Sequence, residues 1–142
     1  MVTRHLSFLL IACLVVLSCE EHKFVRPEAI VGSWRSEAVY LNGVNSEQYF
    51  DWLNTGSVFI IKNDNTYARN YVWGNWRLSN EELRLEANEN MGMVDWNYKI
   101  IEQTKDQLTL ELHLTESQYC CNFDSFTDTE IITIKEVYKR ID

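Results

Sequence analysis

Apolar and polar residues alternate with a period of two through the middle of the chain, which predicts short β-strands that each bury one face. Turn-forming residues separate these runs at 63–65, at Gly74 and at 79–81. The expected strands cover residues 59–61, 66–73, 75–78 and 83–87. A meander of this kind leaves open edges and half a core, so it must be completed by strands from both sides.

The flanking sequence supplies those strands. The clearest alternation places Leu108, Leu110, Leu112 and Leu114 on one face, and further strands are expected at 30–41, 94–104 and 130–140. Residues 46–53 carry apolar side chains at helical spacing, which predicts a short helical plug after the first strand. The fold class is therefore all-β, a single up-and-down antiparallel β-barrel of about eight strands.

The first residues have the pattern of an export signal. An uncharged run at 8–17 is too short to span a bilayer as a helix but has the length of a signal-peptide core. The end of the run, Val16-Leu17-Ser18-Cys19, resembles the lipobox of bacterial lipoproteins, in which the cysteine is acylated and becomes the new N-terminus. We therefore expect a lipoprotein signal peptide at 1–18, lipidation at Cys19, a flexible tether at 19–28 and one barrel domain at 29–142. The alternative is an ordinary secretory signal in which Cys19 has no role.

The net charge of the chain limits the classes of partner that we expect. The whole chain has a net charge of −8, and removal of residues 1–18 takes away only Arg4 among the charged residues, which gives −9. Such a protein is repelled by phosphate backbones, so nucleic acid is not expected as a partner. Glu20 and Glu21 directly after Cys19 resemble a surface-export signal of some lipoproteins, but they fit a plain solvated tether equally well.

A family resemblance is carried by two Gly-x-Trp motifs. Gly32-Ser33-Trp34 on the first strand resembles the lipocalin signature, and Gly74-Asn75-Trp76, a Phe-x-x-x-Asn-Asp-x-Thr-Tyr pattern starting at Phe59, and Leu83-x-Leu85 are similar to the lipocalin-like domain of bacterial envelope lipoproteins. The resemblance implies that Trp34 plugs the closed end of the barrel and that Arg140 packs across it. It also implies an outer-membrane lipoprotein, anchored by acyl chains such as palmitate, in either leaflet.

Catalytic chemistry is not indicated. His5 and His22 precede the domain, and His113 lies on the polar face of its strand beside Glu111, so no His is placed for a triad in the barrel, and two metal ligands without a third are weak evidence for a metal site. We expect neither an enzyme nor a cofactor. Cys120 and Cys121 are adjacent in a loop of an exported protein and could form a strained, redox-active disulfide, a structural turn lock, or free thiols without a role.

The aromatic residues suggest a ligand site. Strand parity points Arg69 inward with Tyr71, and places Tyr40, Trp96 and Tyr98 nearby. An inward Arg must be paired, either with Glu136 or with an anionic ligand such as a fatty acid. The leading hypothesis is a barrel that binds a small hydrophobic or amphipathic molecule. The rival is a solidly packed interaction module whose loops, above all 117–128, dock another envelope protein.

Overall fold

The computed structural model describes residues 25–45, 56–89, 95–115, 118 and 130–142. Several sequence predictions lie outside these residues, namely the signal peptide, the lipidated Cys19, most of the tether, the helix at 46–53 and the Cys120–Cys121 pair.

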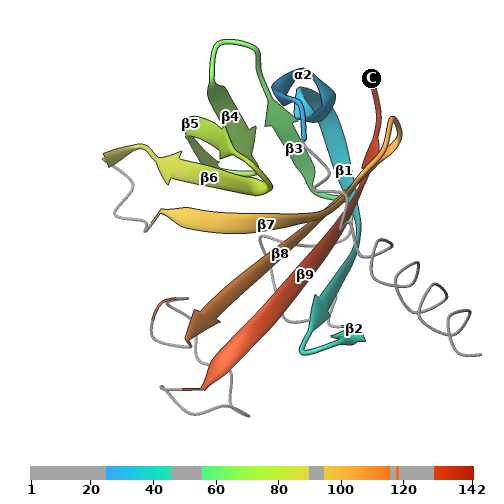
Figure 1. Cartoon of the computed structure of the whole chain (residues 1–142), viewed down its shortest axis with the longest axis vertical. Coiled ribbons are helices and arrows are strands. Elements are labelled where there is room, and N and C mark those ends of the chain that lie inside the picture. Colours follow the sequence, from blue (N-terminus) through green and yellow to red (C-terminus); the bar gives the residue numbers. More distant parts are fainter. Residues whose placement is uncertain (1–24, 46–55, 90–94, 116–117, 119–129) are drawn as a thin grey trace, which may run out of the picture.

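Nine antiparallel strands and one short helix make up the described part of the chain (Figure 1). The elements are α2 (Pro27–Ile30), β1 (Gly32–Leu41), β2 (Val44–Asn45), β3 (Val58–Ile61), β4 (Thr66–Arg69), β5 (Val72–Ser79), β6 (Glu82–Ala87), β7 (Trp96–Gln103), β8 (Gln107–Thr115) and β9 (Ile131–Arg140). Each strand from β3 to β9 pairs with its neighbours in sequence, and β1 pairs with both β3 and β9. The predicted eight-stranded up-and-down barrel is confirmed, with β2 as an extra strand on β1.

Asparagine residues set several of the turns. Asn42, Asn65 and Asn80 have positive φ angles of 47°, 62° and 56°. Asn tolerates this left-handed backbone better than most residues because its short polar side chain can hydrogen-bond locally. The predicted turns at 63–65 and 79–81 join β3 to β4 and β5 to β6, and a turn at Asn42-Gly43 joins β1 to β2.

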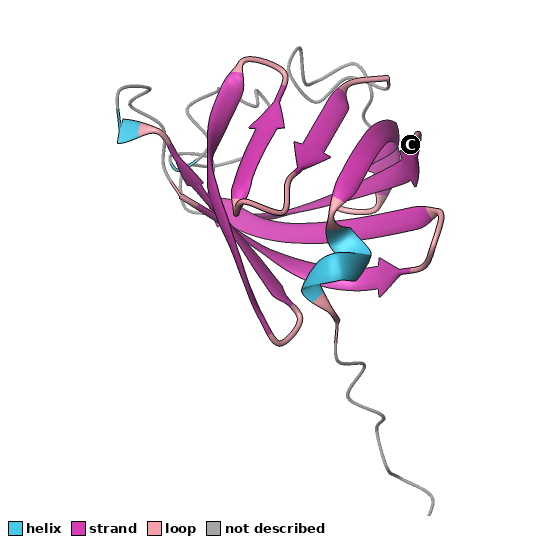
Figure 2. Ribbon diagram, turned by 90° about the horizontal axis from the view of Figure 1, so that it is seen from above, coloured by secondary structure: helices cyan, strands magenta, loops and turns pink. Residues whose placement is uncertain are grey.

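The two ends of the barrel differ. We call the end that carries α2 and the C-terminus the closed end; both lie at the top of Figure 1, and Figure 2 shows the strands curving around a common interior beside α2. The opposite end, at which β1 ends, β9 begins and β4 turns into β5, is called the open end. Connections longer than a tight turn join β1 to β3, β6 to β7 and β8 to β9 there.

The core lies inside the barrel and follows the predicted alternation closely on β7 and β8. Trp96, Tyr98 and Ile100 are buried on β7. All four leucines of the 108–114 alternation are buried on β8. Val25 is buried and α2 begins at Pro27, so ordered structure extends into the segment 19–28 that was expected to be a flexible tether.

A bulge in β1 overturns part of the predicted strand face. The register between β1 and β9 shifts between Ser36 and Ala38, so Trp34 and Ser36 point inward but Val39 and Leu41 take over the inward positions beyond them. Tyr40 was expected inside the barrel near Arg69 and instead lies on the outer face with Ala38, half-buried. One extra residue in a strand reverses the side-chain parity after it.

A tight turn corrects the second strand of the predicted meander. The expected strand 66–73 is broken by a two-residue turn at Asn70-Tyr71, so Arg69 pairs with Val72, and Ala68 with Trp73. Tyr71 is 85% exposed and Trp73 is 54% exposed. Gly74 was expected to bend the chain but lies within β5, where a Cβ atom would come 1.9 Å from the Glu86 carbonyl oxygen of β6.

Candidate functional site

Trp34 seals the closed end of the barrel. Its side chain is fully buried, and its indole Nε1 donates a hydrogen bond of 2.8 Å to the Ile30 carbonyl of α2. The guanidinium of Arg140 lies 4.1 Å from the centre of the Trp34 ring. This is the contact that the lipocalin resemblance implied, and at this distance the cation stacks on the negative face of the ring.

Arg140 also ties the chain ends to the barrel. It donates hydrogen bonds of 2.8 and 2.9 Å to the carbonyls of Ala29 and Val31, and one of 2.7 Å to that of Lys105. Gly32 makes room for this side chain, because a Cβ atom there would lie 2.1 Å from Arg140 Nη1. The closed end is therefore fixed by backbone contacts from α2, from Val31 directly before β1 and from the β7–β8 turn.

A polar cluster of four residues crosses the middle of the barrel; its members are Arg69, Tyr98, Glu136 and Tyr138. Arg69 Nη2 forms a 2.8 Å ion pair with Glu136 Oε2, and Nη1 donates a 2.8 Å hydrogen bond to the Tyr98 hydroxyl. Tyr98 donates in turn to Glu136 Oε1 at 3.2 Å, and Tyr138 donates to Glu136 Oε2. Glu136 thus accepts three hydrogen bonds and cancels the charge of Arg69.

Aromatic rings surround the guanidinium of the polar cluster. The Arg69 Cζ atom lies between 5.6 and 5.9 Å from the ring centres of Phe59, Trp96, Tyr98 and Tyr138. The rings also contact one another, with Phe59 and Tyr138 at 5.7 Å and Trp96 and Tyr98 at 6.0 Å. Because Arg69 is only 3% exposed and Glu136 is fully buried, water is largely excluded from this ion pair.

Burial and the charges within the cluster keep Arg69, Tyr98 and Tyr138 each in one protonation state. It raises the pKa of the Tyr98 and Tyr138 phenols well above their ordinary value, despite the nearby Arg69 charge. Burial alone would lower the pKa of Arg69, but Glu136 and the tyrosines raise it well above the ordinary value. Arg69 is therefore charged and both phenols are neutral hydrogen-bond donors at every physiological pH.

Among the described residues, two serine hydroxyls near the cluster have no hydrogen-bond partner. Ser36, which is 1% exposed, pairs in register with Tyr138, and its backbone N–H bonds to the Ser57 carbonyl at 2.8 Å. The Oγ atoms of Ser36 and Ser57 are both buried and make no hydrogen bond within the described residues. Buried hydroxyls in proteins are nearly always hydrogen-bonded, so an unsatisfied pair in one place calls for an explanation.

The structure brings together some of the predicted ligand residues and separates others. Trp96 and Tyr98 lie beside Arg69 inside the barrel, and Glu136 provides the ion pair that was expected as one of two alternatives. Tyr40 lies on the outer face because of the β1 bulge, and Tyr71 lies outside at the hairpin tip.

Sequence reasoning missed three components of the interior. Tyr138 could have been found, because it follows Glu136 by two residues on the same strand and so shares its face. Ser36 lies within the expected strand 30–41 and Ser57 precedes the expected strand 59–61, and neither was predicted to be a polar group of the core. Burial of a short hydroxyl leaves no signal in a pattern of apolar and polar positions.

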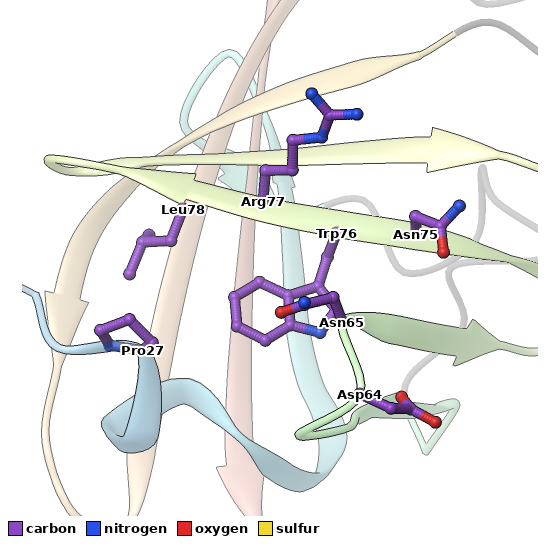
Figure 3. Close-up of a pocket in the computed structure, with 7 residues that line it drawn as sticks. All are labelled: Pro27, Asp64, Asn65, Asn75, Trp76, Arg77 and Leu78. Atoms are coloured by element: carbon purple, nitrogen blue, oxygen red, sulfur yellow. The ribbon is translucent and has the colours of Figure 1, made fainter.

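Two hollows on the outer surface are polar and shallow. The larger, of about 590 Å³, lies near the closed end, with Trp76 between Pro27 and the Asn65 turn (Figure 3). Trp76 offers little surface there, since it is buried and donates from Nε1 to the Lys62 carbonyl at 2.9 Å. The smaller, of about 490 Å³, is lined by Asn75, Glu86, Ala87, Asn88, Glu89 and Asp95. The smaller is lined almost entirely by polar residues, and the larger exposes more polar than apolar surface, whereas small-molecule sites are usually lined mainly by apolar side chains.

Little metal-binding chemistry is present on the part of the outer surface that the structure describes. His113 Nε2 lies 3.1 Å from Glu111 Oε1, and Nδ1 lies 3.1 Å from Thr133 Oγ1, so both ring nitrogens have protein partners. In the part of the chain that the structure describes, no three His, Cys, Asp or Glu side chains are grouped to hold a metal ion. The helices of that part include none with the length and apolar character needed to cross a membrane.

The chain matches no protein-family model and no curated protein sequence. The barrel geometry and the polar cluster are therefore the main basis for a functional proposal.

Proposed function

We propose that this protein is a lipid-anchored envelope protein whose barrel binds a small amphipathic molecule through the open end. The polar group of the molecule would lie at the polar cluster and its hydrocarbon part in the upper barrel. The upper barrel is the set of inward side chains between the cluster and the open end, namely Leu41, Leu112, Leu114, Ile132 and Ile134.

The observation that carries the proposal is the buried polar cluster in an otherwise apolar barrel. Replacing a buried ion pair by well-packed apolar residues is often neutral or stabilising, by up to about 4 kcal/mol. Stability alone is therefore a weak reason for a barrel to keep Arg69 and Glu136 in its interior, and two unsatisfied serine hydroxyls lie beside Tyr138. A site that orients a polar group within an apolar container explains both features.

The anchor in this proposal rests on the lipobox-like sequence that ends at Cys19, and the envelope location rests on the same segment. The lipocalin-like arrangement of Trp34 and Arg140 supports a barrel closed at one end, and we therefore assign ligand entry to the other end. Lipocalin-like barrels of eight strands are wide enough to hold one small ligand.

The direct test is native mass spectrometry of the acylated protein purified from its own membrane in mild detergent. A retained small molecule would appear as a discrete added mass of a few hundred daltons, and it should be absent from an Arg69→Met/Glu136→Leu variant, in which the polar cluster is removed as a pair. Tryptophan fluorescence titrations with a neutral and with an anionic amphiphile give a second readout, because Trp96 lies beside the cluster. No retained molecule and no saturable fluorescence change would refute ligand binding.

A second candidate function, a protein-interaction module, is favoured by the exposed aromatic pair Tyr71 and Trp73 at the β4–β5 hairpin. Aromatic residues are enriched in protein interfaces. In the same mass spectra this function would appear as a co-purified polypeptide that is lost from a Tyr71→Ser/Trp73→Ser variant.

A further inference from the structure

We infer that the ligand of the proposed site is an uncharged amphiphile, such as a long-chain alcohol or ester, and not a fatty acid anion. The inference rests on the proposed function and specifies its ligand class. It follows from the charge balance of the polar cluster and from the two unsatisfied hydroxyls beside it.

The charge balance disfavours an anion. Arg69 and Glu136 form a 2.8 Å ion pair in which the two charges cancel, and both side chains are buried. An incoming carboxylate would approach Arg69 next to the Glu136 carboxylate, and it would become an unpaired third charge in a site that water does not reach. Burying an unpaired charge is strongly unfavourable.

The hydrogen-bond balance also points to a neutral group. Glu136 already accepts from Arg69, Tyr98 and Tyr138, so its capacity is largely used. The free capacity lies in the buried Ser36 and Ser57 hydroxyls, each of which can donate one hydrogen bond and accept others. An alcohol satisfies both roles, and an ester carbonyl accepts from either serine.

The positions of the two serines in the barrel also support a neutral polar group on the ligand. Ser36 pairs with Tyr138 of β9, its backbone bonds to Ser57, and Phe59 two residues further on packs against Tyr138 at 5.7 Å. The serines therefore lie on the β1–β3 side of the barrel, at the level of the polar cluster. In the β1–β9 register, Leu41 and Ile134 of the upper barrel follow toward the open end, where a hydrocarbon chain would extend.

The first experiment compares probes of equal chain length on the unmodified protein. Tryptophan fluorescence titrations at about pH 8, where a carboxylic acid is ionised, would use decanol and decanoate. We expect decanol to bind at least about tenfold more tightly than decanoate. A tenfold difference in affinity equals the free energy of about one pKa unit. Equal binding, or tighter binding of decanoate, would overturn the inference and leave ligand binding intact. If neither probe bound, both this inference and the proposed ligand-binding function would be refuted.

The second experiment tests the serines. Ser36→Ala and Ser57→Ala should each lower the affinity for decanol by about 2- to 10-fold, the usual effect of losing one hydrogen bond. Neither should change the affinity for 1-bromodecane, which has the same chain without a hydrogen-bonding group. The matched control is Ser79→Ala, since Ser79 is exposed on β5 near the closed end. If both probes lost affinity equally, or if neither variant lost affinity for decanol, the serines would be ruled out as partners of the ligand's polar group.

The third experiment inverts the selectivity. Glu136→Gln keeps the side-chain shape and leaves the Arg69 charge without its carboxylate, so decanoate should bind at least about tenfold more tightly than to the parent. Decanol affinity should change less. A folded Glu136→Gln variant without gain for decanoate would contradict the charge argument; if this variant does not fold, the decanol-to-decanoate ratio of the parent still decides.

Discussion

Replacing Trp34 by Ala tests whether the closed end holds the barrel together. The side chain is fully buried, hydrogen-bonded to Ile30 through Nε1 and covered by Arg140 at 4.1 Å. Truncating a buried Trp costs about 3–5 kcal/mol through lost burial and the cavity left behind. Loss of the stacking partner of Arg140 adds about 0.5–2 kcal/mol. Against a total stability of about 5–15 kcal/mol, the variant would retain only a part of its folding free energy.

The assay is thermal and urea unfolding followed by circular dichroism. For a domain of this size each kcal/mol shifts the melting temperature by about 3–5 °C, so a loss of about 4 kcal/mol lowers it by about 10–20 °C. Trp73→Ala is the matched control, because it removes the same side chain from a position that is 54% exposed, and it should cost less than about 1 kcal/mol. The plug assignment would be wrong if Trp34→Ala melted within a few degrees of the parent or no lower than Trp73→Ala.

Three further predictions concern β5, the alkaline limit of stability and the anchor. Gly74→Ala should destabilise the barrel by about 1–3 kcal/mol in urea unfolding, because its Cβ would meet the β6 backbone at 1.9 Å, whereas Asn75→Ala should have little effect. Burial raises the pKa of Tyr67 from 10.0 to about 12, so its contribution to stability is present below pH 10.0 and is lost as the pH rises through about 12. Tyr67→Phe should make that alkaline loss of stability shallower, although Tyr98 and Tyr138, whose pKa values are also raised, still contribute to it; an unchanged slope would contradict the prediction. Cys19→Ala should leave a precursor that no longer partitions into detergent, and continued partitioning would argue against lipidation.

Much of the fold could be predicted from local pattern. The leucine alternation of β8 specified its buried face without further information, and Asn42-Gly43 specified the β1–β2 turn. These signals work because the side-chain period of a strand and the backbone preference of a turn residue are both local properties. The barrel followed from the number of strands and the short connections between them.

The details of the site depended on features with no local signal. The β1 bulge moved Tyr40 to the outer face, and the turn at Asn70-Tyr71 moved Tyr71 and Trp73 outside. A bulge adds one residue without any composition cue, and Asn-Tyr is not a strong turn pair, so strand parity carried past either point gives the wrong face. Arg69 was placed correctly because it precedes its turn.

The position of α2 bears on how the proposed anchor would orient the barrel. Ala29 and Ile30 are bound at the closed end through Arg140 and Trp34, and only six peptide units separate Cys19 from the buried Val25. A fully extended segment of that length spans about 20 Å. A lipid at Cys19 would therefore hold the closed end near the membrane and favour an open end that faces away from it. In that orientation the proposed ligand enters from the aqueous compartment or from a protein that delivers it, and not by lateral movement out of the bilayer to which the barrel is tethered.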